Sequence, residues 1–589
     1  MSLQFIFGNS GSGKSHYLYQ QIVEESIRHP EKNYLVLVPE QFTMQTQKDL
    51  CMAHPRGGIM NIDVLSFGRL AHRVFEETGK ERQPILDDEG KNLVLRKIAG
   101  NYEDELTVLK GNLKKQGYIS EVKSVISEFT QYGIDFEQLD SFMEGLNPES
   151  YLYYKLKDIR KVYEGFEDYL RDKYITKEEL LDVLSQTVPE AKMLKDSVIA
   201  MDGFTGFTPV QNRLIGELLK VCDKIMLTVE IDRREDPFVY KHPYQLFALS
   251  KQMVTSLTEV AQEVRVEIDE PVWLCKNPSY RFKENPEMAF LEEELFRYSR
   301  RKYSGEKMRS ISLHEVHTPQ EEAQYVAEEI RRLVREEGYR YREIAVIASD
   351  LSTYADALEK ACDRYEIPVF MDHKKSILLN SFVEYLRSLL VMVEQNYTYE
   401  SVFRYLRTSL CGFTRDEVDR LENYCLALDL KGFKKWDQVW VRKTPMTTKE
   451  ELEELNHLRM RFVEKLTPLH TVLKKRKKTV KEITLAVYEY LVQEKIQEQL
   501  AELEQKFQED GELALAKEYA QIYRIVLELF DKFVELLGEE EIPLKEYCEL
   551  LDAGLEEAKV GVIPPSLDQV VIGDVQRTRL KSNLKALFF

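Results

Sequence analysis

A phosphate-binding loop near the start of the chain constrains its fold more than any other feature. Residues Gly8 to Ser15 read G-x-x-x-x-G-K-S and directly follow the apolar run Leu3–Phe7. This motif needs a strand to deliver the loop, glycines that let backbone N–H groups surround a polyphosphate, and a helix whose N-terminus faces the phosphates. The sequence therefore predicts a strand, a loop and a helix from Ser15 to Arg28 in a parallel α/β fold.

The loop residues have expected roles in binding ATP and Mg²⁺. Lys14 is expected to reach the β- and γ-phosphates, and the Ser15 hydroxyl to ligate Mg²⁺. A carboxylate after a later strand completes such sites, and Asp202 follows the apolar run Val198–Met201. The alternative is that Asp202 only caps a turn. The expected nucleotide-binding residues are Gly8, Asn9, Ser10, Gly11, Ser12, Gly13, Lys14, Ser15 and Asp202, with Ser15 and Asp202 as metal ligands.

Apolar runs of strand length alternate with helical patterns along the chain, which favours two parallel α/β lobes, each with a large helical insertion. The expected parts are a first lobe (1–83 and 196–270), its helical insertion (84–195), a connector (271–310), a second lobe (311–396 and 559–589) and its helical insertion (397–558). The expected strands are Leu3–Phe7, Tyr34–Val38, Asp63–Leu65, Val198–Met201, Ile225–Val229, Ile311–Val316, Ile344–Ala348, Tyr365–Phe370, Val570–Gly573 and Ala586–Phe589. Because the chain stops on an apolar run, we expect a fragment of a longer protein.

Composition argues against a membrane or disulfide-rich protein. No apolar stretch reaches the roughly 18 to 20 residues needed to cross a bilayer, and a phosphate loop at residue 8 leaves no room for a signal peptide. The seven cysteines form no C-x-x-C pair, so we expect free thiols in a reducing, cytoplasmic setting and no metal site built from them. The net charge of -19 disfavours nucleic-acid binding by the whole surface but allows a basic channel.

Four motifs resemble the AddB subunit of the bacterial AddAB helicase-nuclease. They are Leu37–Thr43, Val64–Ala71, Asp202–Gln211 and Ile563–Arg579. The layout of two α/β lobes, each interrupted by helices, is also that of superfamily 1 helicases. The likeness runs over the whole chain. The partner of AddB, AddA, would need an adenine-binding glutamine motif before the phosphate loop, and the preceding residues leave no space for it.

This resemblance implies a part in double-strand break repair by recombination. AddAB unwinds and degrades duplex DNA ends until it meets a Chi sequence, and then leaves a 3′ single strand for RecA. Within the heterodimer with AddA, AddB binds ATP without being the motor and recognises Chi in single-stranded DNA. AddB also carries a nuclease domain with a cysteine-ligated iron-sulphur cluster near its C-terminus. Because family members are longer, we expect the nuclease and cluster residues beyond Phe589.

The residues for rapid ATP hydrolysis are incomplete. A motor ATPase follows its Mg²⁺-binding Asp with a Glu that activates water, but position 203 is Gly, and the next carboxylate, Glu217, has the pattern of a solvated helix residue. Active superfamily 1 helicases also tend to place an arginine where this chain has Ser349-Asp350. The sequence predicts nucleotide binding without efficient turnover. An active ATP-driven helicase is the alternative, whereas a small-molecule kinase would need neither the second lobe nor the insertions.

Single-stranded DNA contacts are expected where the strands of the first lobe end, because parallel sheets present ligand sites at that edge. The residues there include hydrogen-bond donors, a cation and aromatic rings suited to stacking bases. The resemblance to AddB implies that residues at these positions take part in recognising Chi. Core packing is the alternative for Phe67 and Phe207, and His72 stands where a larger aromatic is expected. The expected DNA-binding residues are Gln41, Thr43, Phe67, Arg69, His72 and Phe207.

Basic segments of the second insertion are candidates for a duplex or single-strand path. One is Lys474–Lys478, and another is Lys431–Trp436, with further aromatic and basic residues at Trp440, Arg442 and Lys443. The residues His373, Lys374 and Lys375 are similar. The commoner role of such charge runs is a solvated helix face.

Overall fold

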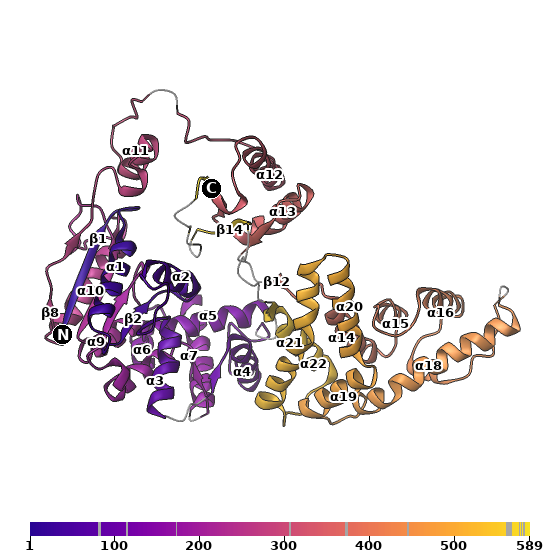
Figure 1. The fold of residues 1–589 in the computed structure, drawn as a ribbon. Helices are drawn as coiled ribbons and strands as arrows, with labels where there is room; N and C mark the ends of the chain where they lie inside the picture. Colours follow the sequence, from indigo (N-terminus) through magenta and orange to yellow (C-terminus); the bar gives the residue numbers. More distant parts are fainter. Residues whose placement is uncertain are drawn as a thin grey trace. The chain divides into compact units, whose positions relative to one another are not determined.

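The computed structural model describes the chain except for residues 80–83, 113–115, 172, 306–307, 372–374, 445–446, 561–567, 576–577, 579 and 581–583. The described residues form two compact units (Figure 1). The first unit contains Met1–Leu86, Glu121–Val369 and Gly573–Phe589, and the second contains Asp87–Ser120 and Phe370–Ile572. The lobe and insertion boundaries expected from the sequence stay predictions.

A parallel sheet forms the centre of the first unit. Its strand order is β3-β2-β6-β7-β1-β8, and β9 also pairs with β1. Every residue of β2 and β6 is buried, as expected for parallel strands covered on both faces. The strands are β1 (Ser2–Gly8), β2 (Tyr34–Leu37), β3 (Ile62–Leu65), β6 (Val198–Met201), β7 (Lys224–Glu230), β8 (Glu267–Ile268) and β9 (Val272–Trp273). All five strands expected for the first lobe are present, which confirms its parallel α/β class.

Alternate side chains of these strands pack on opposite faces of the sheet. On β1, Phe5 and Phe7 join one hydrophobic core, and Ile6 joins another. The core around Ile6 is covered by α1 (Lys14–Arg28) and α2 (Thr43–Ala53). The core around Phe5 is covered by α3 (Phe67–Thr78), α8 (Leu180–Thr187), α9 (Pro209–Leu219) and α10 (Ala248–Glu263).

The stretch between β3 and β6 is mainly helical, as expected. Short strands β4 (Ile85–Leu86) and β5 (Ile175–Thr176) pair in parallel within it. Its other elements are α4 (Asp88–Asn101), α5 (Gln116–Tyr132), α6 (Phe136–Glu144), α7 (Tyr151–Leu170), η2 (Val188–Glu190) and η3 (Lys192–Leu194). Elsewhere in the first unit, η1 (Glu40–Phe42) follows β2, and η4 (Tyr280–Phe282) and α11 (Pro286–Glu294) follow β9.

A second sheet has the order β11-β14-β10-β15, with β10 parallel to β15. Its elements are α12 (Pro319–Glu336), η5 (Tyr341–Glu343), β10 (Ile344–Ala348), α13 (Leu351–Arg364), β11 (Val369–Met371), β14 (Val570–Asp574) and β15 (Ala586–Phe588). Thr318 caps α12 by accepting from the Glu321 N–H. The Glu321 carboxylate accepts from the His317 N–H, which satisfies a second N–H group at the start of the helix.

The strand expected at Ile311–Val316 is wrong. These residues form no strand, and Leu313 is 97% exposed. Alternating apolar residues favour a strand only where a neighbour offers a hydrogen-bonding ladder. Both edges of β10 are already paired, with β14 and β15. The expected motif at 563–567, its Arg579, and the basic residues His373 and Lys374 lie outside the described residues.

The described part of the second unit is mainly helical and contains a short antiparallel pair, β12 (Lys375–Ser376) and β13 (Lys559–Val560). Thr414, Thr448 and Thr479 each close a capping box at the start of a helix, a pairing that fixes helix N-termini. Besides α4, its helices are α14 (Ser381–Glu394), α15 (Tyr399–Leu406), α16 (Arg415–Leu428), α17 (Phe433–Asp437), α18 (Lys449–Leu473), α19 (Val480–Gln493), α20 (Ile496–Glu509), α21 (Leu513–Leu537) and α22 (Leu544–Glu557).

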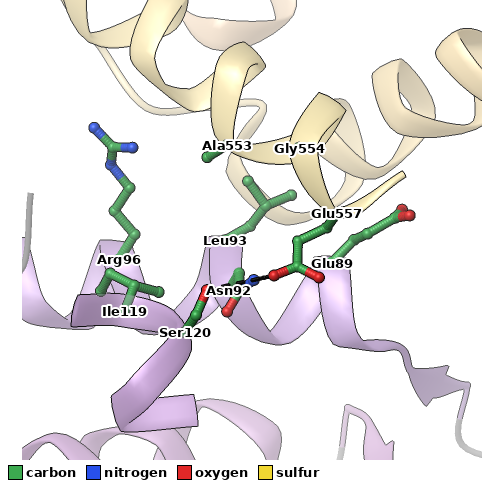
Figure 2. Close-up of a pocket in the computed structure, with 9 residues that line it drawn as sticks. All are labelled: Glu89, Asn92, Leu93, Arg96, Ile119, Ser120, Ala553, Gly554 and Glu557. Atoms are coloured by element: carbon green, nitrogen blue, oxygen red, sulfur yellow. Dashed lines mark hydrogen bonds between the residues drawn. The ribbon is translucent and has the colours of Figure 1, made fainter. Parts of the chain in front are cut away.

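A small pocket lies within this unit (Figure 2). Its volume is about 20 Å³, enough for about one water molecule. Asn92 donates to Glu557 across it, over 3.1 Å. The lining residues are Glu89, Asn92, Leu93, Arg96, Ile119, Ser120, Ala553, Gly554 and Glu557. Across the described chain, no helix is long and apolar enough to cross a membrane.

Candidate nucleotide-binding site

The phosphate loop joins the end of β1 to the start of α1. Gly13, the residue before the helix, has φ 94° and ψ 19°, a left-handed conformation that glycine adopts without the cost of a Cβ atom. Gly13 has no side chain to cap α1. The N–H groups of the first turn therefore face the loop, the arrangement with which helix N-termini bind phosphate.

Lys14 is held inside the loop. Its Nζ donates to the backbone oxygen of Asn9 over 3.0 Å. Burial lowers the pKa of Lys14, and the nearby carboxylates of Glu230 and Asp202 oppose that shift. The ammonium group thus lies in a partly desolvated site, where its attraction for phosphate is stronger than in bulk water.

Asp202 collects hydroxyl groups from two elements of the first unit. Its Oδ1 accepts from Ser15 of α1 over 2.9 Å and from Thr228 of β7 over 2.7 Å. Its Oδ2 accepts from Tyr19, one turn further along α1, over 2.7 Å. The side chain is buried, with 2% of its surface exposed. These three hydrogen bonds fix the Asp202 carboxylate beside the Ser15 hydroxyl of the loop. They involve residues far from the turn, so Asp202 does more than cap a turn.

The donor set fits ATP with Mg²⁺. Mg²⁺ is usually held by one or two carboxylates, substrate phosphates and water, and Ser15 and Asp202 are the matching protein groups. Two buried polar atoms of the loop, Asn9 Oδ1 and Ser12 Oγ, have no hydrogen-bond partner, as expected of a cradle built for a polar ligand. Among the described residues, no group of three or more His, Cys, Asp and Glu side chains is arranged to hold a metal.

The position after Asp202 does not supply a catalytic carboxylate. Gly203 has φ 79°, a left-handed conformation that disfavours a residue with a side chain. Glu217 on α9 instead pairs with Lys220 over 2.6 Å, so the interpretation of Glu217 as a solvated helix residue is supported. At the end of β10, Asp350 accepts from Thr353 in the first turn of α13.

Two residues near the loop are not among those expected from the sequence. Glu292 of α11 accepts from Asn9 Nδ2 through both carboxylate oxygens, each over 3.1 Å. The Arg281 N–H donates to the backbone oxygen of Gly11 over 3.1 Å. Burial raises the pKa of Glu292. Both residues lie in the expected connector, whose sequence has no periodicity or motif that would have indicated them.

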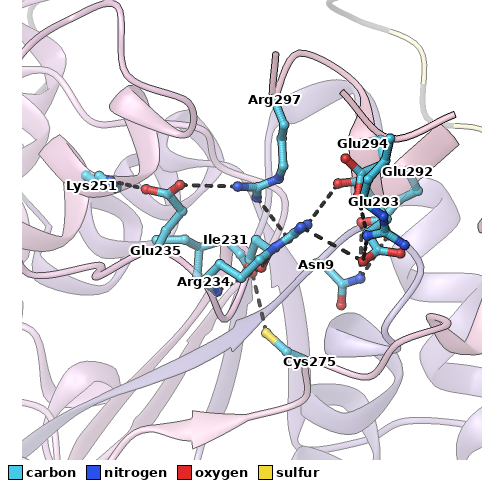
Figure 3. A network of polar contacts seen from close by, with 12 residues as sticks. Asn9, Ile231, Arg234, Glu235, Lys251, Cys275, Glu292, Glu293, Glu294 and Arg297 are labelled. Atoms are coloured by element: carbon cyan, nitrogen blue, oxygen red, sulfur yellow. Dashed lines mark hydrogen bonds and ion pairs between the residues drawn. The ribbon is translucent and has the colours of Figure 1, made fainter. Parts of the chain in front are cut away.

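Within the first unit, a network of charged residues holds the segment around Glu293 and Arg297 against the residues that follow β7 and against α10 (Figure 3). Arg297 contacts Asp232 over 2.9 Å and Glu235 over 3.3 Å. Glu235 also pairs with buried Lys251 of α10 over 2.5 Å. Arg234 bonds to Asp232 and to the backbone oxygen of Glu293. The segment next to Glu293 that carries Glu292 is therefore fixed beside the phosphate loop.

The expected DNA-binding residues divide into exposed and buried sets. Gln41, Arg69 and His72 are exposed. Thr43 is buried and donates to the backbone oxygen of Glu40 over 3.0 Å. These residues follow β2 and β3, which are neighbours in the sheet. Contact with DNA stays a prediction for all of them.

The expected aromatic residues gather in one cluster. Phe67 is 8% exposed and packs in the core beneath α3. Its ring centroid lies 5.5 Å from that of Phe204 and 6.3 Å from that of Phe207. Phe204 and Phe207 are half-buried. The alternative of core packing therefore describes Phe67 in this structure, while Phe207 keeps an accessible part of its ring.

Two family profiles match the chain. The family described as "ADDB, N-terminal" matches residues 5–292. The family described as "UvrD-like helicase C-terminal domain" matches residues 282–560. The first match contains the phosphate loop, Asp202 and every expected DNA-binding residue.

Curated proteins of similar sequence are named as the B-type subunits of ATP-dependent helicase/deoxyribonucleases. The protein of Lachnoclostridium phytofermentans is 42% identical over 595 residues, which cover 100% of this chain and 52% of the relative. That of Clostridium novyi is 34% identical, covering 98% and 50%. That of Acetivibrio thermocellus is 33% identical, covering 100% and 52%. The chain thus spans about half the length of the curated relatives that it matches.

Proposed function

The chain belongs to the AddB family of helicase-nuclease subunits, and on this premise we propose that it binds ATP and DNA and recognises Chi without being the motor. Its place would be in a heterodimer with an AddA-type subunit that processes double-strand breaks for recombination. The observation that carries the nucleotide part is the buried Asp202, which accepts the hydroxyl of Ser15 over 2.9 Å.

Binding of ATP with Mg²⁺ is supported by the chemistry of the loop. Lys14 would neutralise the phosphates, and the N–H groups at the start of α1 would surround them. Ser15 and Asp202 would hold the Mg²⁺ ion, which would bridge the protein to the phosphates. The Arg281 N–H bonds to Gly11, and the charge of Arg281 adds to the lowering of the pKa of Lys14, so Arg281 is a candidate second cation for the nucleotide.

Feeble hydrolysis is supported by the residue after Asp202. Gly203 has no group to orient or deprotonate water, and its φ of 79° makes the position unsuited to a glutamate. The missing base is worth roughly 10² to 10⁴ in rate in enzymes that have one. ATP would therefore act mainly as a bound ligand, while the partner subunit would drive unwinding.

Recognition of single-stranded DNA is supported at the strand ends of the first lobe. Arg69 and His72 lie one helical turn apart on α3, both exposed, and Gln41 is exposed after the neighbouring strand. Donors and cations of this kind position a DNA strand, and aromatic rings stack its bases. We propose that Phe207, with an accessible ring, is the aromatic of the site.

The nuclease activity in the name of the relatives is assigned, in this proposal, to the part of those proteins that this chain does not span. The iron-sulphur cluster of the family is assigned to the same part. The test is direct: we expect the purified chain to lack visible cluster absorbance and Mg²⁺-dependent DNA cleavage.

An active ATP-driven helicase is the second candidate, and the intact loop with its Ser15–Asp202 contact favours it. The two candidates differ in DNA-stimulated ATP turnover by the purified chain. We expect nucleotide binding with little or no stimulation by DNA. Turnover at tens per second, a rate within the ordinary enzyme range of roughly 1 to 10³ per second, would instead identify a motor.

A further inference from the structure

Two basic segments that are far apart in the sequence come together in the second unit. One lies on α17 and contains Lys434 and Lys435. The other is the turn between α18 and α19 and contains Lys474, Lys475 and Arg476. We call these five residues the basic patch. None of them belongs to the nucleotide site of the first unit.

A stack of two rings holds the segments together. The ring of Phe433, next to Lys434, lies on the ring of His470, with centroids 3.7 Å apart and planes inclined by 12°. His470 is one helical turn before Lys474 on α18. Burial of the imidazole is the main cause of a lowered pKa of His470, and the proximity of Lys474 adds to that shift. The stack therefore brings the two basic segments to one region of the surface.

The base of the patch is rigid. Trp436 is buried, and its ring centroid lies 4.5 Å from that of Phe462 on α18. Arg459, also buried, donates through Nη1 to the backbone oxygen of Trp436 over 2.7 Å. Trp440 is buried and donates to the backbone oxygen of Lys435 over 3.0 Å. Buried contacts thus fix the α17 segment, while the side chains of Lys434 and Lys435 stay exposed.

The charges of the patch are largely uncompensated. All five side chains are exposed, and none makes an ion pair with another described residue. The flanking lysines are different, because Lys431 pairs with Asp429 and Lys477 with Glu541. The exposed acid Asp437 offsets one charge. Several net positive charges therefore face solvent on a chain whose total charge is -19.

The surroundings of the basic patch indicate which form of DNA it would bind. Single strands are usually bound on exposed aromatic rings that stack bases, but Trp436 and Trp440 are buried here and Phe433 is covered by His470. Lysines that act as point charges suit the closely spaced phosphates of a duplex, whose backbone they bind without regard to sequence. The chemistry favours duplex DNA over single-stranded DNA.

We propose that the basic patch of α17 and the α18–α19 turn holds the phosphate backbone of duplex DNA. The inference rests on the proposed function in taking DNA as the partner. It adds a duplex contact in the second unit that is separate from the nucleotide site and from the single-strand residues of the first unit. This contact would hold the duplex that has not yet been unwound, and its affinity would not depend on the DNA sequence.

The experiment compares two charge-removing pairs with a matched control in the full chain. Lys434→Gln with Lys435→Gln removes two charges on one side, and Lys475→Gln with Arg476→Gln removes two on the other. The control, Lys506→Gln with Lys517→Gln, removes two charges from exposed lysines of α20 and α21 in the same unit. Binding of a fluorescent blunt duplex is measured by anisotropy over a range of salt.

Each patch pair should weaken duplex binding about tenfold at low salt and lower the slope of log Kd against log salt by about two. The control pair should do neither. Nucleotide binding and single-strand binding should be unchanged in all variants, so a failure here is distinguishable from a failure of the proposed function. Equal weakening by the control pair, or undiminished duplex binding by both patch pairs, would overturn the proposal.

A second measurement uses the unaltered protein. Acetylation of surface lysines, read by mass spectrometry, should be suppressed at Lys434 and Lys475 when duplex DNA is present, and unchanged at Lys506. Protection by an AddA-type partner protein and not by duplex would identify a protein interface instead and would also overturn the proposal. The proposal would also be overturned if the unaltered chain did not bind duplex DNA.

Discussion

The hydroxyl of Ser15 lies 2.9 Å from Oδ1 of Asp202, although the two residues are 187 positions apart in the chain. The strand order accounts for this contact, because the sheet places β7 directly between β6 and β1. The loop after β1 and the acid after β6 therefore meet at one edge, as ligand-binding groups do in open parallel sheets.

Replacing Lys14 tests the nucleotide site. Lys14→Ala should weaken binding of a fluorescent ATP analogue about tenfold or more, equivalent to about 1.4 kcal/mol, because the phosphates lose their buried cation. Lys32→Ala is the control, since Lys32 pairs with Asp223 rather than with the loop. Unchanged affinity in a folded Lys14→Ala protein would refute the site.

Replacing Asp202 tests the metal site and the fold together. Asp202→Ala leaves the hydroxyls of Ser15, Tyr19 and Thr228 without this acceptor, and we expect a loss of roughly 2 to 4 kcal/mol in the free energy of unfolding. Asp202→Asn keeps the size and part of the hydrogen bonding. It should retain most stability while removing the dependence of nucleotide affinity on Mg²⁺, as measured by titration with and without the metal. Persistent Mg²⁺ dependence would argue that other groups hold the ion.

Restoring a carboxylate after Asp202 should not create a motor. Gly203→Glu should leave DNA-stimulated ATP turnover low, because the backbone at this position has φ 79° and an ordinary side chain is strained there. Gly203→Ala is the matched control for that strain and should destabilise the protein by a similar amount, about 1 kcal/mol or more. Turnover rising by orders of magnitude in the Glu variant alone would contradict this account.

Glu292 should make nucleotide binding depend on pH. Its carboxylate lies beside the phosphate loop, and burial raises its pKa above the ordinary value for glutamate. Lowering the pH through that raised pKa protonates Glu292 and removes a negative charge from the site, so nucleotide affinity should increase on acidification. Glu292→Gln keeps an acceptor for Asn9 but no charge, so this variant should bind more tightly at neutral pH and lose that component of the pH profile. A profile identical to that of the unaltered protein would exclude the role.

Arg69 and Phe67 should behave differently although the sequence predicts both as DNA-binding residues, because only Arg69 is exposed. Arg69 is exposed, so Arg69→Ala should weaken single-strand binding without changing stability. In the complete two-subunit enzyme it should abolish the response to Chi while unwinding continues. Phe67 is buried, so Phe67→Ala should cost roughly 3 to 5 kcal/mol in folding. Arg73→Ala is the control on the same helix, because Arg73 pairs with Asp63. Variants at Arg69 that still respond to Chi would refute the assignment.

The sequence predicts those parts of the structure that depend on local pattern. The loop, the strands β1 and β6 and their parallel class follow from short motifs and apolar runs, which carry their information within a few residues. The contact between Asn9 and Glu292 joins residues that are 283 positions apart, and no rule of sequence spacing applies over such a separation. The strand expected at Ile311–Val316 is wrong for a related reason, because a strand also needs a free neighbouring edge. Burial of Phe67 likewise depends on its ring contacts with Phe204 and Phe207, which follow β6 and are far from Phe67 in the sequence.

The side-chain amide of Asn9, a residue of the phosphate loop, donates to both carboxylate oxygens of Glu292, and a bound phosphate would offer that amide a second acceptor. A ligand that accepts from this amide would compete with Glu292 of α11 for the same donor. Occupancy of the site would then be coupled to the contact between the loop and α11. If the chain hydrolyses little ATP, as proposed, the bound nucleotide would act as a signal through this contact, independent of hydrolysis.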